Sequence, residues 1–155
     1  MIYDSTSHLP KPVPVGFDEE NPVRLAPHLG NASGNLKFKN PNGGFHPSGT
    51  DASYITGWKA AGDMIRWSIL PASSGYYSIS VRYRGQISHC LLGTQVNGEH
   101  VQTALPDYDH LHDWTEFQTT KASLKAGQET ELTLELIEIG KENELEIEGI
   151  FLKKE

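Results

Sequence analysis

Hydrophobic and polar residues alternate with a period of two along most of the chain from Val23 onward. Such alternation indicates β-strands that are buried on one side only. The two clearest runs are residues 63–70 and 76–84. The residues on their apolar faces are Ile65, Trp67 and Ile69 in the first run, and Tyr77, Ile79, Val81 and Tyr83 in the second. We therefore expect two half-buried strands here.

Short turn sequences separate the predicted strands. Residues 71–75, Pro-Ala-Ser-Ser-Gly, form a loop too short for a parallel crossover, so we predict that the strands on either side pair as an antiparallel hairpin. Asn97-Gly98 lies between the runs 91–96 and 99–103, and this dipeptide is typical of a tight hairpin turn. The sequence thus predicts two hairpins.

Further strands are predicted in the second half of the chain. Residues 114–120 alternate weakly, a turn at Ala126-Gly127 follows, and residues 131–139 and 145–152 come next. The Leu and Glu content of 131–139 also fits a helix, but strict alternation and the β-branched Thr133 favour a strand. Seven or eight short strands without a convincing amphipathic helix predict an all-β fold, a two-sheet antiparallel β-sandwich.

The length of 155 residues predicts one domain. Proline alternates with other residues from His8 to Gly16, which is typical of an extended segment. We interpret residues 1–18 as a linker or as an N-terminal arm packed on the domain, and residues 19–155 as the β-sandwich module. The linker interpretation would imply a further domain upstream.

Charge and cysteine content narrow the range of partners. Residues 1–75 hold six acids and six bases, whereas residues 76–155 hold fourteen acids and seven bases. Nucleic acid and anionic membranes bind clustered Lys and Arg, so we expect neither as a partner. Separately, we expect a monomer. Cys90 is the single cysteine, which excludes an internal disulfide and a cysteine-based zinc site; its apolar strand predicts a buried thiol.

Two motifs resemble a known group of modules. The segments Gly57–Trp67 and Gly75–Tyr83, with Pro71 between them, are similar to the Gly-Asp-aromatic strand and the Pro-x-x-Gly-Tyr-Tyr segment of carbohydrate-binding modules of families 6 and 35. The resemblance covers about residues 20–153. It implies a galactose-binding-like jelly roll that binds sugar at one end of the sandwich.

A second resemblance is to the C-terminal accessory domains of bacterial α-L-fucosidases and sulfatases. It is carried by Gly62–Trp67, Asp113–Phe117 and Ile147–Leu152. It implies the same sandwich, attached to a catalytic domain of a carbohydrate-active enzyme.

The resemblance to families 6 and 35 also implies a site. Trp58 and Trp114 match the two positions where these modules carry aromatic residues that stack on sugar, and both lie in loops that offer little cover. We expect exposed indoles at both positions, although burial in the core is the alternative, which we expect for Trp67. The predicted polar partners are Tyr54, Tyr108, Asp113 and Asn143.

Asn143 departs from the pattern, because the Asn-x-x-Trp that often precedes the last strand of these modules has no counterpart here.

We expect no cofactor. The resembling modules often hold a structural calcium, but their Glu-x-Glu entry is absent; if calcium binds, Asp18, Glu20 and Glu148 are the oxygen ligands to consider. His110 and His112 with the neighbouring carboxylate Asp113 could bind a transition metal, but a polar loop is the simpler interpretation.

The sequence contains no catalytic motif such as Gly-x-Ser-x-Gly or His-Glu-x-x-His. We interpret Glu146 and Glu148 as solvated residues of a strand face, and an enzyme acting through His112 and Tyr108 as the least favoured alternative.

The leading hypothesis is a non-catalytic carbohydrate-binding module of a glycan-degrading enzyme. The resemblance to families 6 and 35 implies that the protein is secreted or periplasmic. The alternative is a structural accessory domain that packs on a fucosidase- or sulfatase-like catalytic domain and binds no sugar. Exposed tryptophans would favour the first, and buried ones the second.

Overall fold

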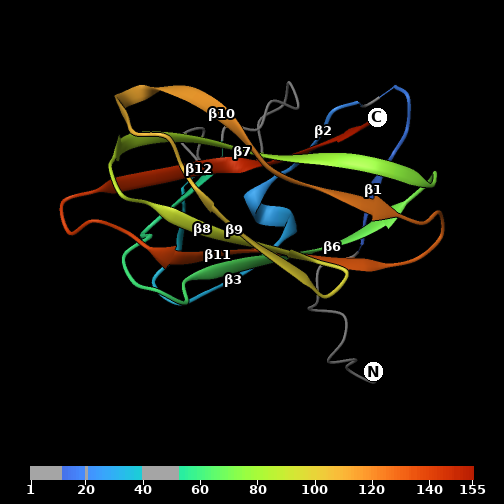
Figure 1. Ribbon diagram of the computed structural model, residues 1–155, viewed down its shortest axis with the longest axis horizontal. Helices are drawn as coiled ribbons and strands as arrows, with labels where there is room; N and C mark the ends of the chain where they lie inside the picture. Colours follow the sequence, from blue (N-terminus) through green and yellow to red (C-terminus); the bar gives the residue numbers. More distant parts are fainter. Residues whose placement is uncertain (1–11, 20, 40–52) are drawn as a thin grey trace, which may run out of the picture.

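The computed structural model describes residues 12–19, 21–39 and 53–155, and they form a sandwich of two six-stranded sheets (Figure 1). The first sheet contains β1 (Val13–Val15), β3 (Asn31–Ser33), β6 (Met64–Pro71), β8 (Leu91–Val96), β9 (Glu99–Ala104) and β11 (Thr130–Glu138). The second sheet contains β2 (Val23–Leu25), β4 (Lys37–Lys39), β5 (Tyr54–Thr56), β7 (Gly75–Ile87), β10 (Tyr108–Leu124) and β12 (Glu144–Lys154).

The all-β sandwich expected from the alternation is confirmed. Its two main paths run in the order β1-β6-β11-β8-β9 and β10-β7-β12-β5-β4, with antiparallel pairs except for β1, which lies parallel to β6. The described residues include one short 3-10 helix, Pro27–Leu29, and no α-helix. No helix in this part of the chain is long and apolar enough to cross a membrane.

The core lies between the sheets and is built from the alternating residues of both. Ile65, Trp67 and Ile69 of β6 face Ile79 and other inward residues of the second sheet, and all of them are buried. The indole N–H of Trp67 donates to the Ala26 carbonyl over 2.9 Å, so its polar group is satisfied inside the core, and the core position predicted for it is confirmed.

The prediction that β6 and β7 form a hairpin is wrong. β6 pairs within the first sheet and β7 within the second, so residues 72–74 cross from one layer to the other. The backbone groups at this connection bond elsewhere: the Ala72 N–H donates to Val15 O over 2.8 Å, and the Gly127 N–H donates to Pro71 O over 2.9 Å. A short loop excludes a parallel crossover, but it does not distinguish a hairpin from a step between sheets.

The other predicted turn and strands are confirmed. Asn97 and Gly98 have φ angles of 54° and 77°, the two positive values that a type I′ turn requires, and they join β8 to β9. β11 is a strand rather than a helix, with Leu132, Leu134 and Leu136 on its buried face.

The sequence favours two interpretations of His8–Gly16, a linker or an arm packed on the domain. Residues 13–15 are packed on the domain, because β1 pairs with β6 and buries Val13 and Val15. Residues 8–11 lie outside the described residues.

Candidate functional site

An arginine lies between two aromatic rings on the outer face of the second sheet. The guanidinium carbon of Arg84, on β7, is 4.1 Å from the ring centroid of Trp114 on β10 and 4.9 Å from that of Tyr54 on β5. The two rings meet edge to face, with centroids 6.0 Å apart. Stacking of a guanidinium on aromatic faces is favourable and fixes the orientation of the rings. We call these three residues the aromatic cluster.

An ion pair connects the aromatic cluster to β12. The Arg84 Nε donates to Glu146 Oε1 over 2.8 Å, and the two side chains are 18% and 25% exposed. Glu148, two residues further along β12, pairs with Arg82 over 3.1 Å. The interpretation of Glu146 and Glu148 as merely solvated is therefore incomplete, because each neutralises an arginine of β7.

Beside the aromatic cluster is a pocket of about 330 Å³, which we call the loop pocket. It is formed where the loop after β5 meets the start of β12. Its lining residues are Thr56, Gly57, Trp58, Lys59, Asn143, Glu144, Leu145 and Glu146. Glu146 thus belongs to the loop pocket and also binds Arg84 of the aromatic cluster. Glu146 therefore connects the pocket to the cluster.

The expectation that Trp58 is an exposed platform is wrong. Its side chain is 3% exposed and belongs to the hydrophobic core. The loop that carries it folds back on the end of the sandwich, where the Gly62 N–H donates to Leu136 O over 2.9 Å. The buried Trp58 Nε1 has no hydrogen-bond partner among the described residues. Trp58 therefore lines the loop pocket from within the core instead of projecting from the surface.

Asp63 holds this loop in place. Its Oδ2 accepts the N–H groups of Lys59 and Ala60 over 3.0 and 3.1 Å, and its Oδ1 accepts the backbone and side-chain N–H groups of Asn35 over 3.0 and 3.2 Å. Burial acts to raise the pKa of the Asp63 carboxyl, but these hydrogen bonds together outweigh burial and lower it.

The predicted polar partners lie at the same end of the sandwich but do not converge on one point. Asn143 lines the loop pocket, yet its amide Nδ2 donates to the Ser88 carbonyl and its Oδ1 accepts the Ser88 hydroxyl over 3.2 Å. Tyr108 donates its hydroxyl to the Asp113 carbonyl over 2.8 Å. The Asn143 bonds join the loop before β12 to the loop after β7, whereas the Tyr108 bond lies within β10. Whether these residues also bind a ligand stays a prediction.

Trp114 retains partial exposure, in contrast to Trp58. The pairing of β10 with β7 shifts register between His110 and Thr115, and Trp114 is the last residue of this irregular stretch. Its position next to Thr115, whose partner Tyr83 faces the core, directs the indole to the outer face where Arg84 lies.

The calcium ligands considered from the sequence are not brought together in the described residues. Glu148 pairs with Arg82, and Glu20 lies outside the described residues. In the part of the chain that the structure describes, no group of three or more His, Cys, Asp or Glu residues could hold a metal ion. Whether calcium binds stays a prediction.

The buried position expected for Cys90 is confirmed. Burial raises the pKa of its thiol to about 12, so the thiol is protonated near neutral pH.

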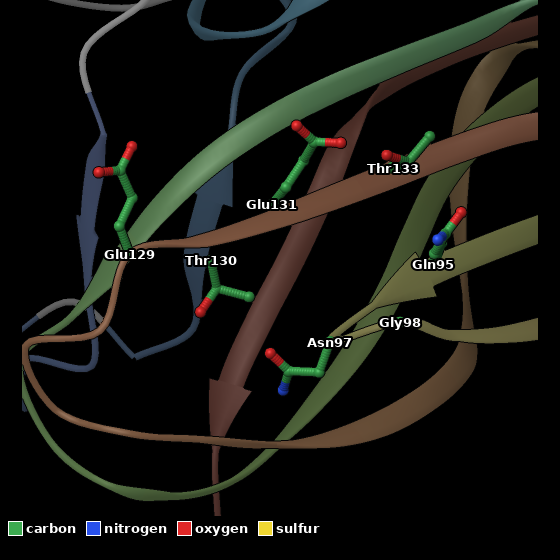
Figure 2. Close-up of a pocket in the computed structure, with 7 residues that line it drawn as sticks. All are labelled: Gln95, Asn97, Gly98, Glu129, Thr130, Glu131 and Thr133. Atoms are coloured by element: carbon green, nitrogen blue, oxygen red, sulfur yellow. The ribbon is translucent and has the colours of Figure 1, made fainter.

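A second pocket, of about 390 Å³, lies at the start of β11 (Figure 2). It is lined by Gln95, Asn97, Gly98, Glu129, Thr130, Glu131 and Thr133. No ring stands among these residues, and Glu129 already accepts the Ser68 hydroxyl over 2.7 Å. It lacks the flat apolar surface on which a sugar ring stacks, so the loop pocket with the aromatic cluster is the stronger candidate.

Sequence reasoning did not identify Lys59, Arg84, Glu144 or Glu146 as site residues. Alternation placed Arg84 on the outward face of its strand, but it could not show that β10 and β12 flank β7 there, or that β5 follows beyond β12. Of these residues, only Arg84 could have been singled out from the sequence pattern, because it is an arginine at the end of a strand in which aromatic and polar residues alternate.

We expect Arg84→Lys to loosen the aromatic cluster. Lysine keeps the charge but loses the planar group that stacks on Trp114 and Tyr54, so the free energy of unfolding should fall by about 1 kcal/mol. The near-ultraviolet circular dichroism of tryptophan should change with it.

Arg82→Lys is the matched control, because Arg82 stacks on Phe151 and contacts no tryptophan among the described residues. Equal tryptophan spectra for the two variants would contradict the role assigned to Arg84.

Comparison with solved structures finds the same fold in carbohydrate-binding modules. A family 35 module from Clostridium thermocellum aligns over 86% of this chain and 98% of its own length, with a TM-score of 0.67 and 19% identity. The C-terminal family 6 module of a marine laminarinase from Zobellia galactanivorans aligns over 86% and 100%, with a TM-score of 0.60 and 16% identity.

The same fold also occurs inside a larger enzyme. A β-1,4-mannanase from Podospora anserina, a family 26 glycoside hydrolase with a family 35 module, aligns over 88% of this chain with a TM-score of 0.63 and 20% identity. This chain spans 28% of the length of that enzyme. No protein-family model matches the sequence, and comparison with curated protein sequences finds no match. These similarities establish the fold: the chain is a β-sandwich of the kind found in family 6 and family 35 carbohydrate-binding modules.

Proposed function

We propose that the chain is a non-catalytic carbohydrate-binding module and that its site is the surface formed by the loop pocket and the aromatic cluster. The observation that carries the proposal is the residue they share: Glu146 lines the polar pocket and also pairs with Arg84, which stacks on the partly exposed Trp114. Carbohydrate needs both features, because pyranose rings offer C–H faces for stacking and hydroxyls for hydrogen bonds.

The chemistry of the site favours binding over catalysis. Glycoside hydrolysis commonly uses a pair of carboxylic groups, one of which donates a proton. Glu146 is paired with Arg84 over 2.8 Å, so this carboxylate is held in an ion pair and, among the described residues, is not placed opposite a second free carboxyl group. Partial burial of one ring contributes about 1.5–3 kcal/mol, which after ordering costs corresponds to a dissociation constant of roughly millimolar to tens of micromolar.

We further propose that the module serves a glycan-degrading enzyme on polysaccharide and is secreted or periplasmic. The mannanase with a family 35 module supports this arrangement, because a weak binding module gains from being linked to a second binding unit. The accessory-domain alternative is favoured by one observation, the burial of Trp58. It is opposed by the partial exposure of Trp114 beside a pocket.

Trp114→Ala should weaken binding at least tenfold without unfolding the protein. The variant removes the ring on which sugar would stack, a loss of about 1.5–3 kcal/mol of binding energy. The measurement is a screen of the full chain on a glycan array, followed by calorimetric titration of the glycans that bind.

Tyr76→Ala is the matched control, because Tyr76 is an aromatic residue 63% exposed at the start of β7, away from the pocket. Equal weakening of glycan binding by both substitutions would contradict the assignment of the site to Trp114. A folded wild-type chain that binds no glycan would favour the accessory-domain alternative.

A further inference from the structure

The positive and negative charges in and beside the loop pocket are equal in number, although the chain as a whole is acidic. The pocket is lined by one ammonium group, on Lys59, and by two carboxylates, on Glu144 and Glu146. Arg84 neutralises Glu146 through the 2.8 Å ion pair. The four groups therefore carry two positive and two negative charges, while residues 76–155 as a whole hold fourteen acids and seven bases.

Two of these groups are available to a ligand. The side chains of Lys59 and Glu144 are exposed, and among the described residues neither makes a hydrogen bond or an ion pair. Lys59 can only donate hydrogen bonds and Glu144, when ionised, can only accept them. The free part of the pocket therefore presents one donor group and one acceptor group of opposite charge.

An uncharged sugar uses both groups, because each hydroxyl can donate to a carboxylate and accept from an ammonium. A uronate or a sulfated sugar gains from Lys59 but is repelled by Glu144, and it cannot donate from its anionic group to the carboxylate. The acidic surroundings add a repulsion of longer range that salt would screen.

We propose that the loop pocket takes an uncharged sugar and rejects anionic sugars, with Glu144 as the residue that determines this specificity. This inference rests on the proposed function, since it names the class of carbohydrate that the same site accepts. It predicts that the wild-type chain binds neutral glycans at least tenfold more tightly than their carboxylated counterparts.

The test compares neutral and carboxylated polysaccharides of matched backbone: glucan with glucuronan, galactan with galacturonan, and mannan with mannuronan. Binding is measured by affinity electrophoresis at low and at high salt. Glu144→Lys should weaken binding of the neutral polymer and strengthen binding of the carboxylated one, so that the tenfold preference disappears.

Glu142→Lys is the matched control, because it makes the same charge change two residues away at an exposed position that does not line the pocket. It should leave the preference within about twofold of wild type, and an effect equal to that of Glu144→Lys would overturn the assignment to Glu144.

Two outcomes separate this inference from the proposed function. Wild-type binding of carboxylated polymers as tight as, or tighter than, that of neutral ones overturns the inference and leaves the proposed function standing. Binding to no polymer by a natively folded chain overturns both.

Discussion

Replacing Asp63 with alanine is expected to lower the free energy of unfolding by about 3 kcal/mol and to release the loop that carries Trp58. Asp63 is 3% exposed and accepts four hydrogen bonds from Asn35, Lys59 and Ala60. Removing the carboxylate would leave three backbone N–H groups without their acceptor, and hydrogen bonds to a charged group contribute about 1.5–3 kcal/mol each in favourable cases. The expected value is below the sum, because the freed loop can rehydrate.

The contribution of Asp63 should depend on pH in a defined direction. Its pKa is lower in the folded chain than its ordinary value, because the hydrogen bonds that favour the carboxylate outweigh the effect of burial. A depressed pKa adds stability that is fully present above the ordinary value, about pH 4, and is lost as the pH falls through the folded-state pKa. The wild-type chain should therefore lose this contribution in acid.

Urea unfolding of wild type and Asp63→Asn at pH 7, 5 and 3 measures the effect. The amide keeps the shape of the carboxylate but carries no charge and offers only one acceptor oxygen, so the variant should be less stable at pH 7, and the difference should shrink at pH 3. Asp107→Asn, at an exposed position, controls for the loss of one carboxylate. A difference between wild type and Asp63→Asn that stays constant with pH would contradict the assignment.

Local patterns predicted the strands well, because alternation depends only on which face of each strand is buried. The faces of β6, β7, β11 and β12 follow from residue order, and the Asn97-Gly98 turn follows from two positive φ angles. Which strands pair with each other does not follow from such local patterns. β6 and β7 are separated by three residues but lie in different sheets, because each pairs with strands elsewhere in the chain: β6 with β1, β3 and β11, and β7 with β10 and β12.

The candidate site was predicted only in part, for the same reason. Trp58 is buried because its loop is tied to Asp63, whose other oxygen binds Asn35, a residue distant in sequence. Trp114 is supported by Arg84, and their contact depends on the order of strands in the second sheet. Sequence resemblance indicated the end of the sandwich where this candidate site lies, but it could not distinguish which tryptophan is buried and which is partly exposed.

Gly85→Ala should cost about 3 kcal/mol of unfolding free energy, and it should act at the site as well as on stability. Gly85 is buried on β7 with a φ of 130°, and a Cβ there would lie 1.9 Å from the Glu144 carbonyl oxygen. That oxygen belongs to the backbone, so the clash is relieved only if β7 and β12 move apart. Urea unfolding measures the stability of the variant.

The matched control is Gly98→Ala. Gly98 also has a positive φ, of 77°, but a Cβ there meets no atom within 4 Å, so this substitution carries backbone strain alone and should cost about 1 kcal/mol. Equal losses for the two variants would show that β7 and β12 are not in close contact at Gly85.

The position of Gly85 explains why its replacement should also weaken ligand binding. Gly85 pairs with Leu145, between the pairs that β7 makes with Glu144 and Glu146. Separating the strands there moves both carboxylates of the loop pocket and stretches the Arg84–Glu146 ion pair that supports Trp114. Glycan affinity of the folded variant, measured by calorimetry below its unfolding transition, should therefore fall severalfold, whereas Gly98→Ala, at the turn of the opposite end, should bind as wild type does.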